Sequence, residues 1–456
     1  MSQESTDQSH ALDGPVFSTF LKYLLPSLVG LIAMTSASLV DGIFIGNFVG
    51  VTALAAVNLI IPIMTLLFGV GVMLSIGGSV RGGKYLGEKK YSAASAIFSK
   101  TLIFVTLYGV IVIALGLVFE SRLFAGLGAT EELFPVMGEY YRIIMPFLIA
   151  QLITIVLYFF VRLDGYPNLT AAALAVGSVI NIGLDYLFIV VFEWGLAGAA
   201  YATGLSQIVP MLVLMMYFIK PDRKMRLSMR QKNWMEVIQA AYNGISEFIN
   251  EISGGIIALL FNWMLIQRAG VDGVAAITVV NYLLMVGFMV FFAISDSSQV
   301  MISQNFGAKR ADRIRAFLNV AAILTILVSL SFAVVLLTIS EPLIYLFVDN
   351  SNNSAGTVEL AVEFASYVWP VFLVAGINML FSGYLTAVHL PFQSGVVALC
   401  RSLLLPAGFL TLFYFLLPNS QFVAALPVAE GITFVLALML FITHRPEKAI
   451  AMAKAE

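Results

Sequence analysis

Residues 24–40 read LLPSLVGLIAMTSASLV, a run that is apolar apart from a few small hydroxyl groups, and Asp41 follows it directly. An uncharged segment, Ile43–Val49, continues on the far side of this carboxylate. A helix that spans a bilayer needs about 20 mainly apolar residues, so residues 16–46 predict a membrane helix that contains a carboxylate. At a rise of about 1.5 Å per residue, Asp41 lies about 9 Å inside the helix end if that end is near Asn47.

Similar stretches follow along the whole chain. They lie near 51–77, 92–119, 134–160, 169–192, 196–219, 235–267, 271–297, 314–340, 357–387, 391–417 and 420–443. Sixty per cent of the 456 residues are hydrophobic and only 11% are charged, whereas soluble domains are about half apolar and a quarter charged. The sequence therefore predicts an all-α integral membrane protein with twelve transmembrane helices.

Composition also excludes several classes of function. The net charge of −2 gives no sign of a nucleic-acid partner, and a single cysteine, Cys400, rules out an internal disulfide. The first fifteen residues are polar and acidic, unlike the basic and then apolar start of a secretory signal. Because the soluble stretches are too short for a separate catalytic domain, we expect function to lie among the helices and the protein not to be an enzyme.

The distribution of Lys and Arg predicts the orientation, because these residues collect on cytoplasmic loops. If the N-terminus is inside, every Lys and Arg falls on the inner side except Arg122, Arg142 and Arg268. The densest cluster is the basic run Lys220–Lys232. We therefore expect both termini in the cytoplasm of a multi-pass protein of the cell inner membrane, surrounded by membrane lipids and acting as a monomer.

An internal repeat divides the chain into related halves. Gly50–Val57 aligns with Gly270–Ile277, and Tyr85–Lys90 aligns with Asn305–Arg310 at the same offset. Six helices per half is an even number, so the two lobes are parallel repeats, and rocking such bundles opens a cleft to either side in turn. The predicted organisation is a cytoplasmic tail (1–15), an N-terminal lobe (16–219), a cytoplasmic linker (220–234), a C-terminal lobe (235–443) and a second tail (444–456).

Ionisable residues inside a span are costly and therefore indicate function. In the first half these are Asp41 and Asp185; Asn181 lies one helical turn before Asp185 on the same face, and Thr203 lies near the start of the next helix. Such hard oxygen donors predict a site that holds Na⁺ or shares a proton. Two plainer interpretations stay open, namely an interfacial carboxylate at Asp41 and a packing cluster of hydrogen bonds around Asp185.

Two helix-perturbing residues precede this carboxylate on the same helix. Pro26 removes a backbone hydrogen bond and Gly30 follows one turn later, so this is a place where the helix can bend.

The second half offers a different set of polar residues. We expect the substrate cleft to use Glu247, Glu251, Asn281, Asn378 and Arg401. The alternative for Arg401 is a buried ion pair with one of the glutamates, among which Glu430 lies on the last span. Asp164 and Asp296 lie near cytoplasmic helix ends, where we expect them to be solvated.

The sequence contains no complete motif for nucleotide binding, zinc binding or hydrolase chemistry. Gly78–Lys84 has the spacing of a phosphate-binding loop, but Tyr85 stands where Ser or Thr is needed for Mg²⁺. Three histidines and one cysteine cannot form a zinc cluster. We expect no cofactor beyond a coupling ion, Na⁺ or H⁺.

The residues together resemble the multidrug and toxic compound extrusion (MATE) family of cation-coupled antiporters along nearly the whole chain. The resemblance rests on Pro26, on Leu39–Gly46, on Asn181-Ile-Gly-Leu-Asp185 and on Gly195–Thr203. It implies that cationic amphipathic drugs leave the cell in exchange for Na⁺ or H⁺, and that a bend at Pro26 accompanies occupancy of the coupling site. It places that site at Asp41, Asn181, Asp185 and Thr203.

The chain departs from one branch of the family, which has a second acidic site on the seventh and tenth spans. Here the tenth span offers only the neutral Asn378. Phe261 stands at the repeat position of Asp41, so one half is expected to carry the coupling ion and the other to shape the drug cleft. We favour Na⁺, because Asn181 and Thr203 add neutral oxygen ligands. A lipid-linked sugar flippase of similar architecture is the alternative, and a membrane enzyme or receptor is less favoured.

Overall fold

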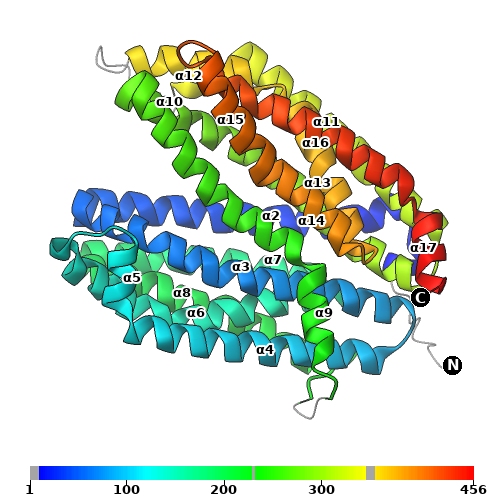
Figure 1. Ribbon diagram of the computed structural model, residues 1–456. Coiled ribbons are helices and arrows are strands. Elements are labelled where there is room, and N and C mark those ends of the chain that lie inside the picture. Colours follow the sequence, from blue (N-terminus) through cyan, green and yellow to red (C-terminus); the bar gives the residue numbers. More distant parts are fainter. Residues whose placement is uncertain (1–9, 229–231, 346–354, 456) are drawn as a thin grey trace. The chain divides into compact units, whose positions relative to one another are not determined.

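The computed structural model describes residues 10–228, 232–345 and 355–455, and regular structure in these ranges is helical (Figure 1). The α-helices are α1 His10–Asp13, α2 Val16–Phe44, α3 Val51–Gly87, α4 Tyr91–Val118, α5 Glu120–Gly126, α6 Phe134–Leu163, α7 Pro167–Asp185, α8 Gly195–Met215, α9 Met235–Asn243, α10 Ile245–Gly307, α11 Ala311–Ile344, α12 Ala355–Val368, α13 Val371–Ala387, α14 Pro391–Leu399, α15 Leu405–Leu416, α16 Ala425–Thr443 and α17 Pro446–Ala455. Short π-helices η1 Ile45–Val49, η3 Tyr186–Val191 and η6 Cys400–Leu404 extend α2, α7 and α14, and 3₁₀ turns are η2 Glu131–Leu133, η4 Met216–Ile219 and η7 Gln421–Ala424. The predicted fold class is confirmed.

The membrane spans agree with the predicted number. In the described part, 11 helices are long and apolar enough to cross a membrane, and α12 with α13 forms a further, bent pair at 54°. Counted as one span, this pair brings the total to 12. The break falls at Trp369–Pro370, where the missing amide hydrogen of proline allows the helix to turn.

The repeat detected in the sequence has a conformational cause. Gly50 and Gly270 both have positive φ, at 120° and 62°, and each lies just before the second span of its half. Gly270 is the kink that divides α10 into two spans. Lys89 and Lys309 likewise share a φ of 58° in the turns after those spans. Equivalent left-handed positions favour the same short Gly-rich and Gly–Lys sequences, which explains why the repeat is visible there.

The chain forms two compact units. Unit 1 comprises residues 1–13 and 21–244, and unit 2 comprises residues 14–20 and 245–456. In unit 1 the span of residues 131–163 is the most buried, and its helix α6 packs against α3, α4 and α8. Unit 2 has its own apolar core around Phe291, Phe364 and Phe372.

The start of the second unit differs from the predicted boundary at residue 235. The helix predicted over 235–267 is divided at Gly244, and its first part, α9, belongs to unit 1. The reason is a close backbone approach: a Cβ on Gly77 would lie 1.8 Å from the Ala240 carbonyl oxygen, and one on Gly244 would lie 2.0 Å from that of Met73. These two glycines therefore hold α9 directly against α3.

Several helices also run beyond the ends expected for membrane spans. The helix α3 continues from the predicted end at residue 77 to Gly87, and α10 continues from the predicted end at 297 to Gly307. Asp296 is consequently buried at 3% exposure inside α10, so the expectation that it is solvated is wrong. The two tails include the short helices α1 and α17.

Candidate functional site

The carboxylates of the first half lie where regular helix gives way to π-helix. Asp41 is close to the end of α2, just before η1, and Asp185 is the last residue of α7 before η3. π-Helical turns are often found at functional sites, because they rotate the following side chains relative to an α-helix. The same helices bring Asn181 one turn below Asp185, and α8 contributes Thr203.

These four side chains lie within one unit, but they make few hydrogen bonds to one another. The Thr203 hydroxyl donates to Asp41 Oδ1 across a long 3.4 Å, and the Asp185 carboxyl group neighbours Asp41. Asp185 is completely buried, and neither of its oxygens has a hydrogen-bond partner within the described ranges. The buried Asn181 amide nitrogen also lacks one there. A buried carboxylate without hydrogen-bond partners is stabilised by a bound cation or by protonation.

Tyr140 of α6 completes this site and is not among the residues predicted for it. It is 3% exposed and lies beside Thr203, Asp41 and Asp185. The adjacent Tyr141 points elsewhere, since a Cβ on Gly116 would lie 2.6 Å from its hydroxyl oxygen. Consecutive helical residues differ by about 100° in direction, so only the packing of α6 shows which tyrosine faces the carboxylates.

The predicted bending point of α2 is braced by a basic residue that the sequence predicts only as one of the charges on the inner side of the membrane. Arg162 of α6 is fully buried and donates hydrogen bonds to Ser27 Oγ at 2.8 Å and Tyr158 Oη at 3.1 Å. Ser27 is adjacent to Pro26, and α2 is an unbroken helix through this proline. At Gly30, a Cβ would lie 2.9 Å from Leu174 Cδ1, so this glycine allows α2 to pack closely on α7.

Asp164, in the turn between α6 and α7, is not simply solvated as expected. It accepts hydrogen bonds from Tyr217 Oη at 2.6 Å and from the Lys224 amide at 2.8 Å. Burial raises the pKa of this carboxyl group to about 6, although these hydrogen bonds act in the opposite direction. Asp164 thus attaches the beginning of the basic linker to unit 1.

In unit 2, two of the predicted cleft residues meet at a glutamate. Arg401 Nε lies 3.1 Å from Glu430 Oε1, and Asn378 Nδ2 donates to Glu430 Oε2 at 2.7 Å. Arg401 lies on the π-helix η6, and its guanidinium is also 5.6 Å from the centre of the Phe288 ring. The alternative that Arg401 forms an ion pair with a glutamate is the arrangement observed.

The remaining predicted cleft residues lie along α10. Glu247 neighbours Glu251, Asp296 and Arg401, and Asn250 accepts a hydrogen bond of 2.6 Å from Ser402. Asn281 is exposed further along the same helix and does not take part in these contacts. Within the described part of the chain, no group of three or more His, Cys, Asp or Glu side chains is arranged to hold a metal ion.

Two helical units with buried carboxylates inside apolar spans define a polytopic membrane transporter. The chain belongs to the MatE family, whose model matches residues 26–187 and 249–411. It is 25% identical over 382 residues to the multidrug export protein MepA of Staphylococcus aureus, with 82% of each chain covered. The corresponding protein of Staphylococcus saprophyticus is 24% identical over 377 residues, again with 82% of each chain covered.

Solved structures share the fold. An outward-facing multidrug resistance MATE transporter superposes with a TM-score of 0.89 at 21% identity, covering 100% of both chains. A MATE transporter in complex with MaL6 gives 0.89 at 21% identity, covering 98% of this chain and 99% of that one. A transporter from Pyrococcus furiosus, described as having a binding pocket of reversed polarity, gives 0.88 at 21% identity and full coverage.

Proposed function

We propose that this protein exports cationic amphipathic compounds from the cell in exchange for Na⁺, with H⁺ as the alternative coupling ion. Membership of the MatE family and the similarity to proteins named as multidrug exporters support export. Alternating access of two lobes would move the substrate. We place both termini in the cytoplasm of the inner membrane, as the Lys and Arg distribution predicts.

The observation that carries the coupling proposal is the state of Asp185. Its carboxyl group is buried beside a second carboxylate, and neither of its oxygens has a hydrogen-bond partner within the described ranges. Two carboxylates so close together, one of them fully buried, repel each other when both are ionised. A bound cation or a shared proton relieves that repulsion, so occupancy changes the stability of this pocket.

The donor set favours Na⁺. Asp41 and Asp185 supply anionic oxygens, while Asn181, Thr203 and the newly placed Tyr140 supply neutral ones. Hard cations prefer such oxygen ligands. We assign the cation to these residues. We also propose that α2 bends at Pro26 and Gly30 when the occupancy of this site changes.

The drug-binding role is proposed for unit 2. Glu247 and Glu251 supply negative charge for a cationic substrate, and Asn378 and Arg401 shape the surroundings through Glu430. A flippase for lipid-linked sugars would be expected to present several basic side chains to a pyrophosphate. The pairing of Arg401 with Glu430 does not favour that function.

The test is efflux from reconstituted vesicles driven by one gradient at a time. We expect ethidium efflux to follow an imposed Na⁺ gradient at equal pH with a protonophore present, and Asp185→Asn to abolish it. Asp272→Asn is the matched control, because this carboxylate lies on α10 of unit 2, where it accepts a hydrogen bond of 3.0 Å from Thr357. Efflux driven only by a pH gradient would show that the coupling ion is H⁺ and not Na⁺. Undiminished efflux by the Asp185→Asn variant would contradict the proposed coupling site.

A further inference from the structure

The short helix α9 presents large apolar side chains on the face that is directed away from unit 1. Trp234, Met235, Ile238 and Tyr242 are 42%, 59%, 57% and 53% exposed. Trp234, Ile238 and Tyr242 are spaced four residues apart and therefore share one side of the helix. We call these four residues the outer face of α9. A helix that faces water shows charged and polar residues there, so this face is suited to an apolar environment.

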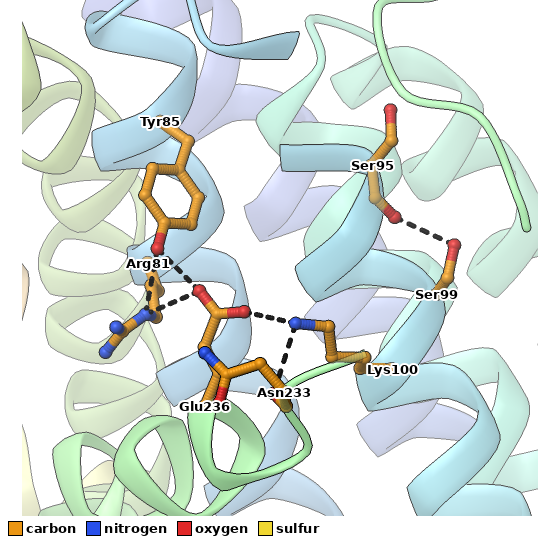
Figure 2. A network of polar contacts seen from close by, with 7 residues as sticks. All are labelled: Arg81, Tyr85, Ser95, Ser99, Lys100, Asn233 and Glu236. Carbon is orange, nitrogen blue, oxygen red and sulfur yellow. Dashed lines mark hydrogen bonds and ion pairs between the residues drawn. The ribbon is translucent and has the colours of Figure 1, made fainter. Parts of the chain in front are cut away.

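The inner face of α9 is fixed to the transmembrane helices by an ion-pair network (Figure 2). Glu236 forms ion pairs with Lys100 of α4 and with Arg81 of α3, the latter at 3.0 Å. The Tyr85 hydroxyl donates to the same carboxylate at 2.5 Å. Together with the close approach at Gly77 and Gly244, these contacts leave α9 little freedom to turn its outer face inwards.

The position of α9 along α3 corresponds to the edge of the apolar span. Ala240 approaches α3 at Gly77, and the next charged residue along α3 is Arg81. Figure 1 shows α9 crossing α3 and α4 instead of running along them. A helix placed crosswise at the level where apolar residues give way to charged ones lies in the interfacial layer of a bilayer, where Trp and Tyr are enriched.

The linker that precedes α9 provides a positive charge beside this face. Residues 220–232 contain six basic side chains and one acidic residue, Asp222. The backbone of the linker is held against α4, since the amides of Arg226 and Ser228 each donate at 3.0 Å, to Ser95 and to Ser99 respectively. The side chains of Arg226 and Lys232 are exposed. Exposed basic groups next to a membrane attract anionic lipid headgroups.

We propose that α9 lies in the membrane interface, with its outer face inserted between lipids and with the basic linker bound to anionic headgroups. The outer face of α9 shares no residue with the proposed coupling site or with the proposed drug-binding residues. Its occupant is the lipid leaflet on the side of the linker.

Fluorescence quenching by brominated lipids tests the insertion. The full-length protein with Trp194→Phe, Trp263→Phe and Trp369→Phe keeps Trp234 as its single tryptophan, and it is reconstituted into lipid nanodiscs. We expect bromines at acyl positions 6 and 7 to quench Trp234 more strongly than bromines at positions 11 and 12. Absence of quenching by either lipid would show that water or protein covers this face and would overturn the proposal.

A second measurement avoids dependence on the triple variant. Ile238→Cys in a Cys400→Ser background carries a nitroxide label, and collisions with oxygen and with a water-soluble nickel chelate report its surroundings. We expect a higher accessibility to oxygen than to the chelate. The reverse order would contradict insertion.

The preference for anionic lipid is measured with brominated phosphatidylglycerol or brominated phosphatidylcholine as a minor component of the same host bilayer. We expect about twofold more quenching by the anionic lipid, and Arg226→Gln with Lys232→Gln to bring the ratio close to one. Lys89→Gln with Lys90→Gln removes two charges from the same unit and should leave the ratio unchanged. Equal quenching by both lipids in the parent protein would overturn headgroup binding. Transport assays on the same variants reconstituted into vesicles report the proposed export function separately.

Discussion

Lys100 of α4 and Glu236 of α9 form an ion pair that is almost completely buried, with side-chain exposures of 4% and 9%. Burial raises the pKa of Glu236, but the hydrogen bonds from Lys100 and Tyr85 and the nearby positive charges lower it further, so the net shift is downward. The glutamate is therefore ionised and joins α9 to two transmembrane helices.

Glu236→Gln should destabilise the protein by about 3 kcal/mol, because it leaves the buried Lys100 without its counter-charge. The measurement is thermal unfolding in detergent. Glu447→Gln removes one partner of the exposed Arg315–Glu447 pair and should change stability by less than about 1 kcal/mol. Equal effects of the two substitutions would contradict the structural role of Glu236.

Asp164 predicts a pH effect of defined sign. Its pKa of about 6 in the folded protein exceeds the value of about 3.9 in an unfolded chain, so the folded state binds more protons between these values. Its contribution to stability is therefore present at low pH and is lost as pH rises through about 6. We expect Asp164→Asn to flatten the pH dependence of the unfolding temperature between about pH 4 and pH 6. An unchanged pH profile would show that this carboxyl group does not titrate there.

Tyr140→Phe should weaken cation coupling while preserving the fold. Loss of one neutral oxygen beside Asp41 and Asp185 is expected to cost about 1 kcal/mol, equivalent to a roughly fivefold higher Na⁺ concentration for half-maximal efflux. Tyr141→Phe is the matched control, because the buried Tyr141 hydroxyl has no hydrogen-bond partner among the described residues. Identical Na⁺ dependence of efflux in the two variants would show that Tyr140 does not contribute to cation coupling.

The Arg401–Glu430 pair should show strong energetic coupling. Glu430→Gln leaves a largely buried guanidinium and Arg401→Met leaves a largely buried carboxylate, with side-chain exposures of 14% and 10% in the pair, so each is expected to cost about 3 kcal/mol. The double variant should lose much less than the sum of the two, as a double-mutant cycle of unfolding measurements would reveal. Additive losses would mean that Arg401 and Glu430 do not stabilise each other.

Gly77→Ala should separate α9 from α3. The added methyl group would meet the Ala240 carbonyl oxygen at 1.8 Å, a position it cannot share. We expect a loss of about 3 kcal/mol. Gly254→Ala on α10 has no neighbouring atom within 4 Å and should change stability by less than about 1 kcal/mol. Comparable unfolding temperatures for both variants would contradict the close packing at Gly77.

By itself, the sequence determined the number of spans, the repeat and the identity of Asp41 and Asp185 as candidate residues. Each depends on local properties: apolar length, left-handed turns at Gly50 and Gly270, and the cost of a charge within a span. Only the tertiary structure decided that Tyr140 joins the carboxylates, that Arg401 pairs with Glu430, and that α9 packs with the first unit. These relationships join residues far apart in the chain, and the packing of helices, which no local pattern encodes, sets which faces meet.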